Sequence, residues 1–524
     1  MPPRGPIGVA EAFRGVDRRT DQQSISPRHL WRAQNFYAGN RGIADMRLGS
    51  SRFNSSQVSG GIGRNIIRYY PAGGTARKIA VFNIATGDII YYGTDATGAL
   101  TEVTGGSSLT ANSQYLFAEF QGNLYIGNAI ELIQVSANGT TRADIGGSPV
   151  APIGYPGGPY RSRLLIFANP TNPTRVSYTD TFTVNTPTDN YITIEHPENP
   201  SAVHVFGRDD DQGVFGDLAI FTPTSTWIVR GDFKDIAGGY SLERAEGRLG
   251  TLSPLSLVDT PYGLMGLGYD GTTDIVVFLI PTGGGRPIVV SEKIREIEAL
   301  PRAYRNLACA TYFKGWYRLS FVPSGGTVPA REWWADLRSF SFSAPDFNID
   351  WWGPMIGRNV GAMAVQSGSG DASELIAIDG NAGYVLTLDP ASTYDDVGTN
   401  PTGILESKLF DGRAPLHKKT FAGMIVGAKP TADENVAVRA LVDEGAAAAS
   451  ATIVMSATSP VVGETTLVGD DTIVGGGRFR EYPKHLSSPL YGNRMSVEVT
   501  YDAGRQFTVK RLGVLGVITK RMHP

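Results

Sequence analysis

Short apolar runs, broken by turn residues, recur along most of the chain. The stretch "FQGNLYIGN" (120–128) shows the pattern: an apolar end, a Gly-containing turn and an alternating apolar run. Runs of β-branched and aromatic residues with Gly, Asn or Asp between them predict β-hairpins. We place Gly122 and Asn123 at the turn of this hairpin. Because side chains alternate along a strand, Leu124 and Ile126 should then face one side of the sheet and Tyr125 the other.

Pairs of such runs repeat through residues 76–390 of the chain. Seven pairs are found: 78–83 with 88–93, 115–120 with 123–128, 163–169 with 175–180, 217–223 with 225–231, 263–268 with 274–280, 307–313 with 316–322, and 374–379 with 384–389. A spacing of about 45 residues is typical of the blades of a β-propeller. Radial stacking of small sheets would bury both of their apolar faces. We therefore predict a propeller of about six to eight blades at 76–390.

The segments on either side of the repeat differ from it. Residues 391–403 are polar and contain Pro and Gly, which predicts a linker. Residues 404–524 alternate again and predict a C-terminal antiparallel β-sandwich of five or more strands. Residues 1–75 are irregular and predict an N-terminal arm with a short helix and a docking segment. The chain as a whole is expected to be all-β.

Two short helices are expected within this all-β pattern. In "SPRHLWRAQNFYAGN", Ser26 is a favourable N-cap, Pro27 occupies the first helical position and Gly39 lies near the end. In "SEKIREIEAL" (291–300), Ser291 is the candidate cap and apolar residues recur along one face.

Charge and composition exclude several classes of protein. The 524 residues carry a net charge of -3, which gives no overall basic surface for wrapping nucleic acid. The single cysteine, Cys309, excludes an internal disulfide and is expected to be a buried small apolar residue. The start of the chain lacks the apolar stretch of a signal peptide, and no run is long enough for a membrane span. These features favour a protein made in a reducing cytosol and soluble there.

Candidate catalytic groups are acidic residues in turns. A propeller glycosidase would need two carboxylates across a sugar ring. The candidates are Asp209, Asp210 and Asp211 in "GRDDDQG", Glu243 and Glu246 in "LERAEG", and Asp270 and Asp274 in "YDGTTD". The "GRDDDQG" stretch could also offer oxygen ligands to Ca²⁺. Solvated turn acids are the favoured interpretation, and the six scattered histidines give no zinc-ligand spacing.

Tryptophans cluster late in the predicted propeller. Trp316, Trp333, Trp334, Trp351 and Trp352 fall within 37 residues. Core and blade-interface packing is the favoured role. The alternative is contact with a glycan or another subunit, for which the candidates are Trp333, Trp334, Trp351 and Trp352.

The N-terminal arm is rich in arginine. Candidate partner-docking residues are Arg14, Arg18, Arg19, Arg28 and Arg32. Such an arm is more often a docking or disordered segment than a nucleic-acid contact.

Several stretches resemble the propeller of phage tail structural proteins. They are "RSRLLIFANPTNPTRVSYTD" (161–180), "LAIFTPTSTWIVRGDF" (218–233), "EGRLGTLSPLSLVDTPYGLMGLGYDGTTDIVV" (246–277) and "VSEKIREI" (290–297). The opening "RAQNFYAGNRGIADMRLGSS" (32–51) and the C-terminal "HKKTFAGMIVGA" (417–428) and "LVDEG" (441–445) are similar to the same proteins. The best match is with the tail nozzle, or tail tubular protein B type, of short-tailed phages.

This resemblance implies a virion structural protein. In that family six copies form a ring below the adaptor under the portal, and DNA leaves through its channel. The implied partners are further copies of the chain, the tail adaptor protein, tail fibre or tip proteins, and DNA in transit. The implied location is the phage tail, assembled in the host cytoplasm. No enzymatic activity, cofactor or metal is expected. The alternatives are a receptor- or glycan-binding tail protein and a propeller glycosidase.

Overall fold

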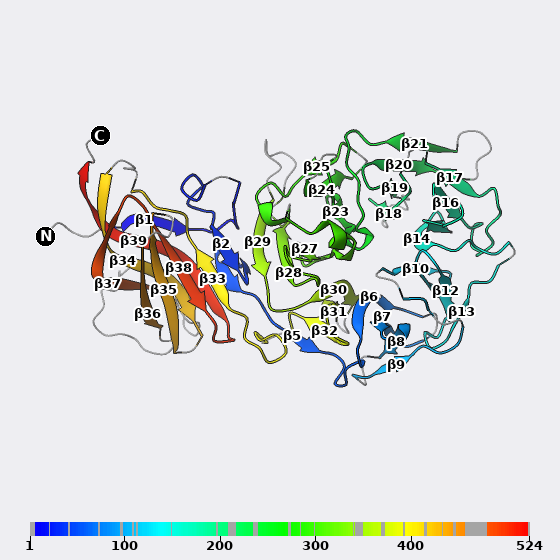
Figure 1. Ribbon diagram of the computed structural model, residues 1–524, viewed down its shortest axis with the longest axis horizontal. Helices are drawn as coiled ribbons and strands as arrows, with labels where there is room; N and C mark the ends of the chain where they lie inside the picture. The colour runs from blue at the N-terminus through cyan, green and yellow to red at the C-terminus, as the bar shows by residue number, and fades with distance from the viewer. Residues whose placement is uncertain are drawn as a thin grey trace. The chain divides into compact units, whose positions relative to one another are not determined.

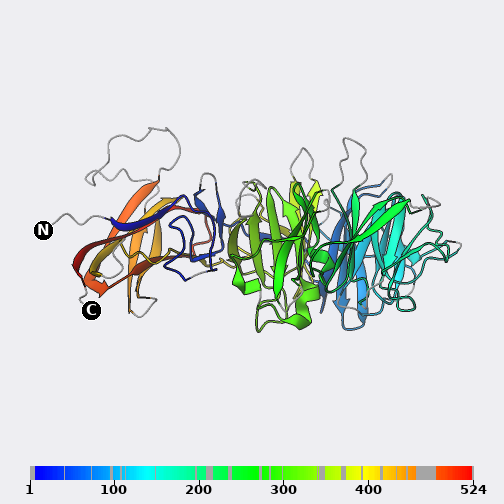
Figure 2. The ribbon, with the colours of Figure 1, turned by 90° about the horizontal axis from the view of Figure 1, so that it is seen from above.

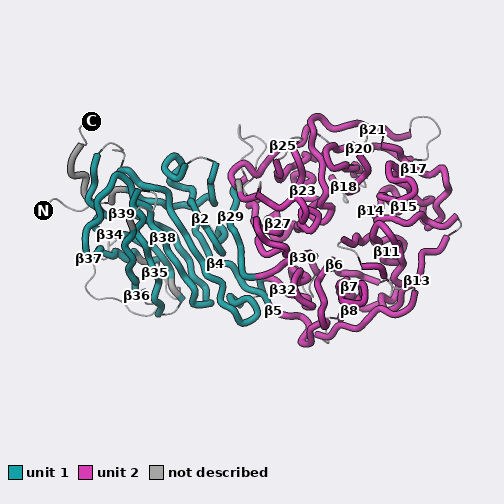
Figure 3. The backbone as a smooth tube through the Cα atoms, viewed as in Figure 1, with its two compact units in different colours: residues 1–50, 350–357, 389–524 teal, residues 51–349, 358–388 magenta. Residues whose placement is uncertain are grey.

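The computed structural model divides the chain into two compact units. The first comprises residues 1–50, 350–357 and 389–524, and the second comprises residues 51–349 and 358–388 (Figure 3). The described residues are 6–19, 21–39, 42–71, 74–94, 98–106, 109–111, 114–147, 149–194, 198–207, 216–233, 239–270, 274–282, 285–297, 299–338, 340, 349–367, 373–390, 393–412, 417–431, 433–443, 447–455 and 479–521.

Seven four-stranded antiparallel sheets follow one another around the propeller. In Figure 1 the first strands of several sheets, such as β6, β10 and β14, lie toward the middle of the ring, and Figure 2 shows the blades from the side. The first four sheets are β6 (Ile62–Tyr69), β7 (Arg77–Ile84), β8 (Gly87–Gly93) and β9 (Leu100–Glu102); β10 (Leu116–Phe120), β11 (Asn123–Gly127), β12 (Leu132–Val135) and β13 (Arg142–Asp144); β14 (Tyr155–Tyr160), β15 (Arg163–Phe167), β16 (Arg175–Tyr178) and β17 (Tyr191–Thr193); and β18 (Ala202–Phe206), β19 (Asp217–Phe221), β20 (Thr226–Gly231) and β21 (Tyr240–Arg244).

The remaining three sheets complete the count of seven. They are β22 (Val258–Thr260), β23 (Gly263–Tyr269), β24 (Ile275–Pro281) and β25 (Ile288–Val289); β26 (Cys309–Phe313), β27 (Trp316–Phe321), β28 (Arg331–Asp336) and β29 (Asp350–Met355); and β30 (Val360–Ser367), β31 (Ser373–Asp379), β32 (Val385–Leu388) and β5 (Ser50–Arg52). The prediction of a propeller with six to eight blades is confirmed, and each of the seven predicted run pairs lies in a different blade.

Each blade buries both of its faces against its neighbours. On β11, Leu124 and Ile126 belong to a buried cluster with residues of the first blade, such as Val81. Tyr125, which points the other way, belongs to a cluster with Leu164 of the third blade. The predicted alternation of this hairpin is therefore confirmed. Its turn lies one residue earlier than predicted, because Gln121 and Gly122 hold the positive φ angles and Asn123 already pairs with Phe120.

The ring closes between the seventh and first blades. Ile376 and Ile378 of β31 share a buried cluster with Ile66, Ala80 and Phe82 of the first blade. The outer strand of the seventh blade is β5, which comes from the N-terminal part of the chain. Pairing of an early strand with the last blade joins segments more than 300 residues apart, so closure depends on a strand outside the repeat.

Both predicted helices are wrong. Residues 26–39 form turns followed by the short strands β2 (Arg32–Gln34) and β3 (Phe36–Ala38). Of residues 291–300, the described ones (298 excepted) form a single helical segment, the 3₁₀ turn η3 (Arg295–Ile297). Ser291 does not cap a helix, since its hydroxyl accepts a hydrogen bond from the backbone N–H of Val277 at 2.9 Å. The other described helical segments are the 3₁₀ helices η2 (Pro254–Ser256) and η4 (Arg302–Leu307).

The first unit is a β-sandwich of two antiparallel sheets. One sheet has the order β3-β4-β39-β34-β37, with β1 also paired to β39, and the other has the order β2-β33-β38-β35-β36. The further strands are β1 (Pro6–Glu11), β4 (Ala44–Met46), β33 (Gly403–Glu406), β34 (His417–Pro430), β35 (Glu434–Val442), β36 (Ala447–Met455), β37 (Arg480–Gly492), β38 (Met495–Tyr501) and β39 (Phe507–Arg521). The rings of Tyr501 and Phe507 stack between the sheets at 4.4 Å. The predicted sandwich is confirmed, and residues 6–46 add four strands to it.

Each unit contains a buried ion pair. In the sandwich unit, Arg47 is fully buried and pairs with Asp396. Its guanidinium also donates to Asn35 Oδ1 and to the carbonyls of Leu48 and Ile356. In the propeller unit, Arg358 Nε donates to Glu332 Oε1 at 2.6 Å, and both side chains are almost fully buried. Replacing one residue of either pair with an uncharged residue would leave the charge of the other buried and uncompensated.

Candidate functional site

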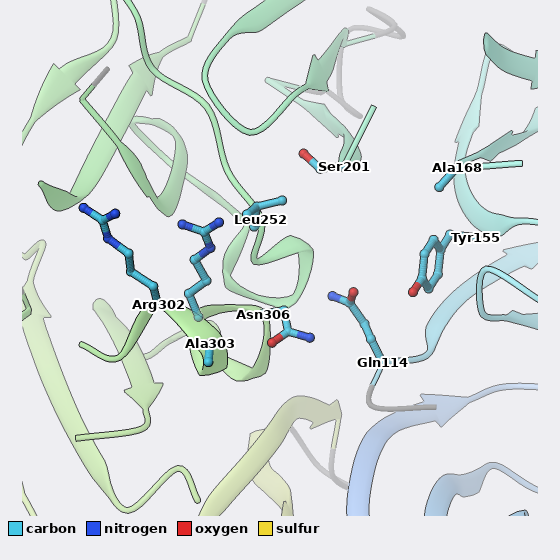
Figure 4. Close-up of a pocket in the computed structure, with 9 residues that line it drawn as sticks. Gln114, Tyr155, Ala168, Ser201, Leu252, Arg302, Ala303 and Asn306 are labelled. Atoms are coloured by element: carbon cyan, nitrogen blue, oxygen red, sulfur yellow. The ribbon is translucent and has the colours of Figure 1, made fainter. Parts of the chain in front are cut away.

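A concavity of about 350 Å³ lies within the propeller unit. Its lining comes from segments just before or at the first strands of consecutive blades, together with the end of β15 (Figure 4). The lining residues are Gln114, Tyr155, Ala168, Ser201, Leu252, Arg302, Ala303, Arg305 and Asn306. Five of the seven blades, or the connections that precede them, therefore contribute residues to this site. The site exists because the propeller brings these segments together.

The short helix η4 supplies the two cationic side chains. Its position is set by Ser253, whose hydroxyl donates to the carbonyl of Arg305. The guanidinium of Arg305 lies 4.5 Å from the ring centroid of Tyr269, a cation–π contact that orients it. Arg302, one turn earlier, is exposed.

The opposite wall is formed by the third blade. Tyr155 starts β14, and its ring packs against Phe167 with centroids 5.6 Å apart. Ala168 directly follows β15 and has a φ of 55°, a left-handed conformation that is uncommon for alanine. The chain turns there because Asn169 Oδ1 accepts the N–H groups of Thr171 and Asn172 at 2.8 and 2.9 Å. This wall is therefore fixed by hydrogen bonds between the Asn169 side chain and the backbone.

Hydrogen bonds from hydroxyl groups hold neighbouring blades in register around the concavity. Ser201, before β18, donates to the carbonyl of Thr251 in the connection to the next blade. Tyr317 of β27 donates to the carbonyl of Ser256 at 3.1 Å. The segment 251–256 is thus bonded to the blades on both sides of it.

The concavity is electropositive. Its lining holds two arginines and no Asp or Glu. Among the described residues, neither Arg302 nor Arg305 forms an ion pair with a carboxylate. Burial lowers the pKa of Arg305 below its ordinary value, since a desolvated cation without a counterion is disfavoured. Burial also raises the pKa of Tyr155 above its ordinary value, against a smaller lowering by a hydrogen bond with the backbone of Ala129.

The predicted docking arginines lie on the sandwich unit and are mostly engaged within it. Arg14 Nε donates to Asp350 at 3.2 Å, and Arg19 makes two hydrogen bonds to Asp17 at 3.2 and 3.0 Å. Arg18 lies 5.4 Å from the ring of Trp31.

Two further arginines complete the predicted set. Arg32 donates to Gln34, the neighbour two residues along β2. Arg28 is exposed, and its backbone carbonyl accepts from the N–H of Arg14 at 2.7 Å, so the two chain segments lie side by side. Of the five, Arg14 and Arg28 are exposed, and the side chain of Arg19 is 37% exposed.

The four candidate contact tryptophans are all interior. Trp333, Trp334, Trp351 and Trp352 are at most 1% exposed. Trp334 illustrates the reason: its indole N–H donates to Glu332 and its ring stacks under Arg318 at 3.8 Å. No ring of this group is available to a glycan, and the packing interpretation holds for all of them.

The candidate catalytic acids do not gather at the concavity. Glu243 lies on β21, the outer strand of its blade, 3.5 Å from Arg230. Asp270 and Asp274 flank the hairpin between β23 and β24, and Glu246 is exposed beyond β21. Asp209, Asp210 and Asp211 lie outside the described residues. Among the described side chains, no group of three or more metal-ligating types is close enough to hold a metal ion.

A half-buried histidine is expected to make the stability of the propeller depend on pH. Burial lowers the pKa of His204, on β18, from 6.5 to about 4. Between these values the unfolded chain binds a proton that the folded chain does not, so stability falls as pH decreases from 6.5 toward 4. We expect His204→Gln to flatten this part of the profile in urea unfolding at pH 7.5 and 4.5. An unchanged slope in the variant would contradict the assignment.

Sequence comparisons do not place the chain in a family. It matches no protein-family model, and no curated protein sequence matches it. Among solved structures, it is similar to one described as "Crystal Structure of the N-terminal Domain of Nup159", with a TM-score of 0.38 and 10% identity over 66% of this chain and 96% of that chain. A similarity at this level carries no argument about function.

Proposed function

We propose that the chain is a non-enzymatic structural component of a phage tail, forming part of a ring-shaped nozzle through which DNA is ejected. The main support for this proposal is the position, within the propeller, of the segments that resemble phage tail proteins. Residues 161–180 and 218–233 form central hairpins of consecutive blades. Residues 246–277 contain the connection whose backbone carbonyls accept hydrogen bonds from hydroxyls of the blades on both sides. The resemblance thus concerns the residues that build and stiffen the ring.

A conduit part must be stiff and must not bind the passing polyanion tightly. Buried apolar clusters shared by neighbouring blades favour a stiff ring. Hydrogen bonds between blades do the same; for example, Ser320 Oγ donates to the carbonyl of Val360 at 2.8 Å. The net charge of -3 avoids the counterion-release binding that lysine- and arginine-rich surfaces give to DNA. In the described part of the chain, no helix has the length and apolar character needed to cross a membrane.

The sandwich offers edges for association with further copies. Among the described strands, β36 and β37 end their sheets, so one side of each has no described strand partner within its sheet. Val454 on β36 is 73% exposed, and Tyr491 on β37 is 60% exposed. Large exposed apolar side chains next to a sheet edge favour protein–protein contact.

A ring of six is the expected assembly under this proposal. Mass photometry and negative-stain imaging should show particles of about 340 kDa, six times the 56.1 kDa chain, with sixfold symmetry. Particles that remain monomeric at all concentrations and in the presence of other tail proteins would contradict the proposal.

The sandwich edges give a variant for the same assay. The pair Val454→Asp and Tyr491→Asp should shift the population toward single chains, because each adds a charge where a neighbour would bury an apolar group. A matched control is Val365→Asp on β30 of the propeller, where the side chain is 41% exposed. Equal loss of assembly in the control would show that the sandwich edges have no special part in it.

A further inference from the structure

We propose that the concavity of the propeller is a binding site for a small organic anion that carries carboxylate or phosphate groups. This inference concerns a ligand of one chain and does not depend on the proposed role in a phage tail. It rests on the charge, donor set and size of the site.

The charge of the site is unbalanced. Arg302 and Arg305 both line the concavity, and neither has a carboxylate partner in the described part of the chain. Five other arginines in the described part of the propeller, by contrast, are paired with acids: Arg163, Arg230, Arg331, Arg338 and Arg358. Two cations in one concavity with no acid in its lining would be stabilised by a bound anion.

The remaining polar groups are donors suited to oxyanions. Figure 4 shows the side chains of Gln114 and Asn306 turned toward one another across the site. The lining thus carries amide groups on Gln114 and Asn306, which also make interactions within the protein, and the hydroxyl of Tyr155, which is hydrogen-bonded to the backbone of Ala129. Guanidinium, amide and hydroxyl donors together match the several oxygens of a phosphate or a polycarboxylate.

The size and rim of the site favour a compact organic anion over a bare ion. A volume of about 350 Å³ lies at the lower end of the range for small-molecule pockets. Leu252 contributes an apolar surface to the lining. A ligand with a short carbon skeleton could contact this apolar margin while its charged groups reach the arginines.

The site is built before any ligand binds. Arg305 is held by its stacking on Tyr269 and by the bond from Ser253 to its carbonyl. Ala168 is held by the turn at Asn169. Because these groups need no rearrangement, little of the binding energy would be lost to ordering them.

Isothermal titration calorimetry of the full-length protein tests the proposal with citrate and inorganic phosphate as probes. Ionic strength is kept constant with sodium chloride, and neutral glycerol serves as the uncharged comparison. We expect saturable binding of at least one anion with Kd below about 5 mM and no binding of glycerol. Preference for citrate would assign the site to carboxylates, and preference for phosphate would assign it to phosphate esters.

Variants at the arginines separate this site from general surface binding. Arg302→Gln should weaken binding at least tenfold, with a far-ultraviolet circular dichroism spectrum like that of the parent, because its side chain is exposed. Arg305→Gln should weaken it similarly. The control is Arg244→Gln on β21, an exposed arginine on the outer edge of a blade, which should bind like the parent. Absence of saturable binding to either anion, or equal affinity in the parent and in Arg302→Gln, would overturn the proposal.

Discussion

Replacement of Glu332 by alanine is expected to lower the free energy of unfolding of the propeller by about 3–5 kcal/mol. The variant would leave Arg358, whose side chain is 2% exposed, buried without its carboxylate. It would also remove the acceptor for the indole N–H of Trp334, which is bonded to Glu332 at 3.1 Å. An unpaired guanidinium in the interior costs far more than the loss of an average hydrogen bond. Urea unfolding at pH 7 measures the change.

A surface pair of the same propeller provides the control for Glu332. Glu243 is 65% exposed and lies 3.5 Å from Arg230, which is itself 38% exposed. Such pairs contribute about 0–1 kcal/mol, so Glu243→Ala should be close to neutral. Combining Glu332→Leu with Arg358→Met should recover much of the stability, since neither charge is then left in the interior. Equal effects of Glu332→Ala and Glu243→Ala would contradict the assignment.

Replacement of Arg47 by methionine should have an effect of similar size in the sandwich unit. The guanidinium is fully buried and donates to Asp396, to Asn35 Oδ1 at 2.9 Å and to two backbone carbonyls. Methionine fills part of the volume but leaves Asp396 buried as an unpaired anion, at a cost of about 3–5 kcal/mol. Hydrogen exchange measured by mass spectrometry should rise in peptides covering β3, β4 and β33.

Two further variants define the cause of that effect. Adding Asp396→Asn to Arg47→Met removes the unpaired charge and should restore part of the lost protection. Arg439→Met is the matched control, because Arg439 is 49% exposed and pairs with Glu498 at 3.1 Å. If the control raises exchange as strongly as Arg47→Met, burial of the charge is not the reason for the loss.

The propeller could be predicted because its central strands are buried on both faces. The detected runs correspond to strands such as β7, β11, β15 and β24, whose sequences are apolar nearly throughout. The outer strands β9, β13 and β21 are short and largely exposed, so they carry no apolar pattern and were not predicted. Burial therefore explains why the inner strands of each blade can be predicted from the sequence and the outer strands cannot.

The helix predicted in the N-terminal segment is wrong because pairing with distant strands outweighs the local helix preference there. Ser26, Pro27 and Gly39 are individually favourable for helix ends, but Arg32–Gln34 pairs with Ile404–Glu406 in a sheet. The pairing of β2 with a strand about 370 residues away has no local counterpart in the sequence. The hydrogen bonds of the sheet and the burial of Ala33 outweigh a weak helix preference.

The candidate site could not be predicted from the sequence, because it too depends on contacts between distant segments. Its lining residues are spread from Gln114 to Asn306 and share no recurring motif. Its two arginines precede a strand whose sequence has no feature that sets it apart from the other strands. The predicted tryptophans attracted attention because they are clustered in sequence, yet they are interior. Closeness in sequence predicts a shared strand or hairpin, whereas this site depends on which segments precede the first strands of five consecutive blades.

The discontinuous sandwich unit has a consequence for how the protein is made. Residues 1–50 of this unit leave the ribosome first, but β34 to β39, to which several of them pair, are translated after the whole propeller. Blades made largely of neighbouring hairpins can form during translation, whereas the first strands must wait for their partners. A released fragment of residues 1–400 should therefore hold a protease-resistant ring while its N-terminal strands are still cleaved.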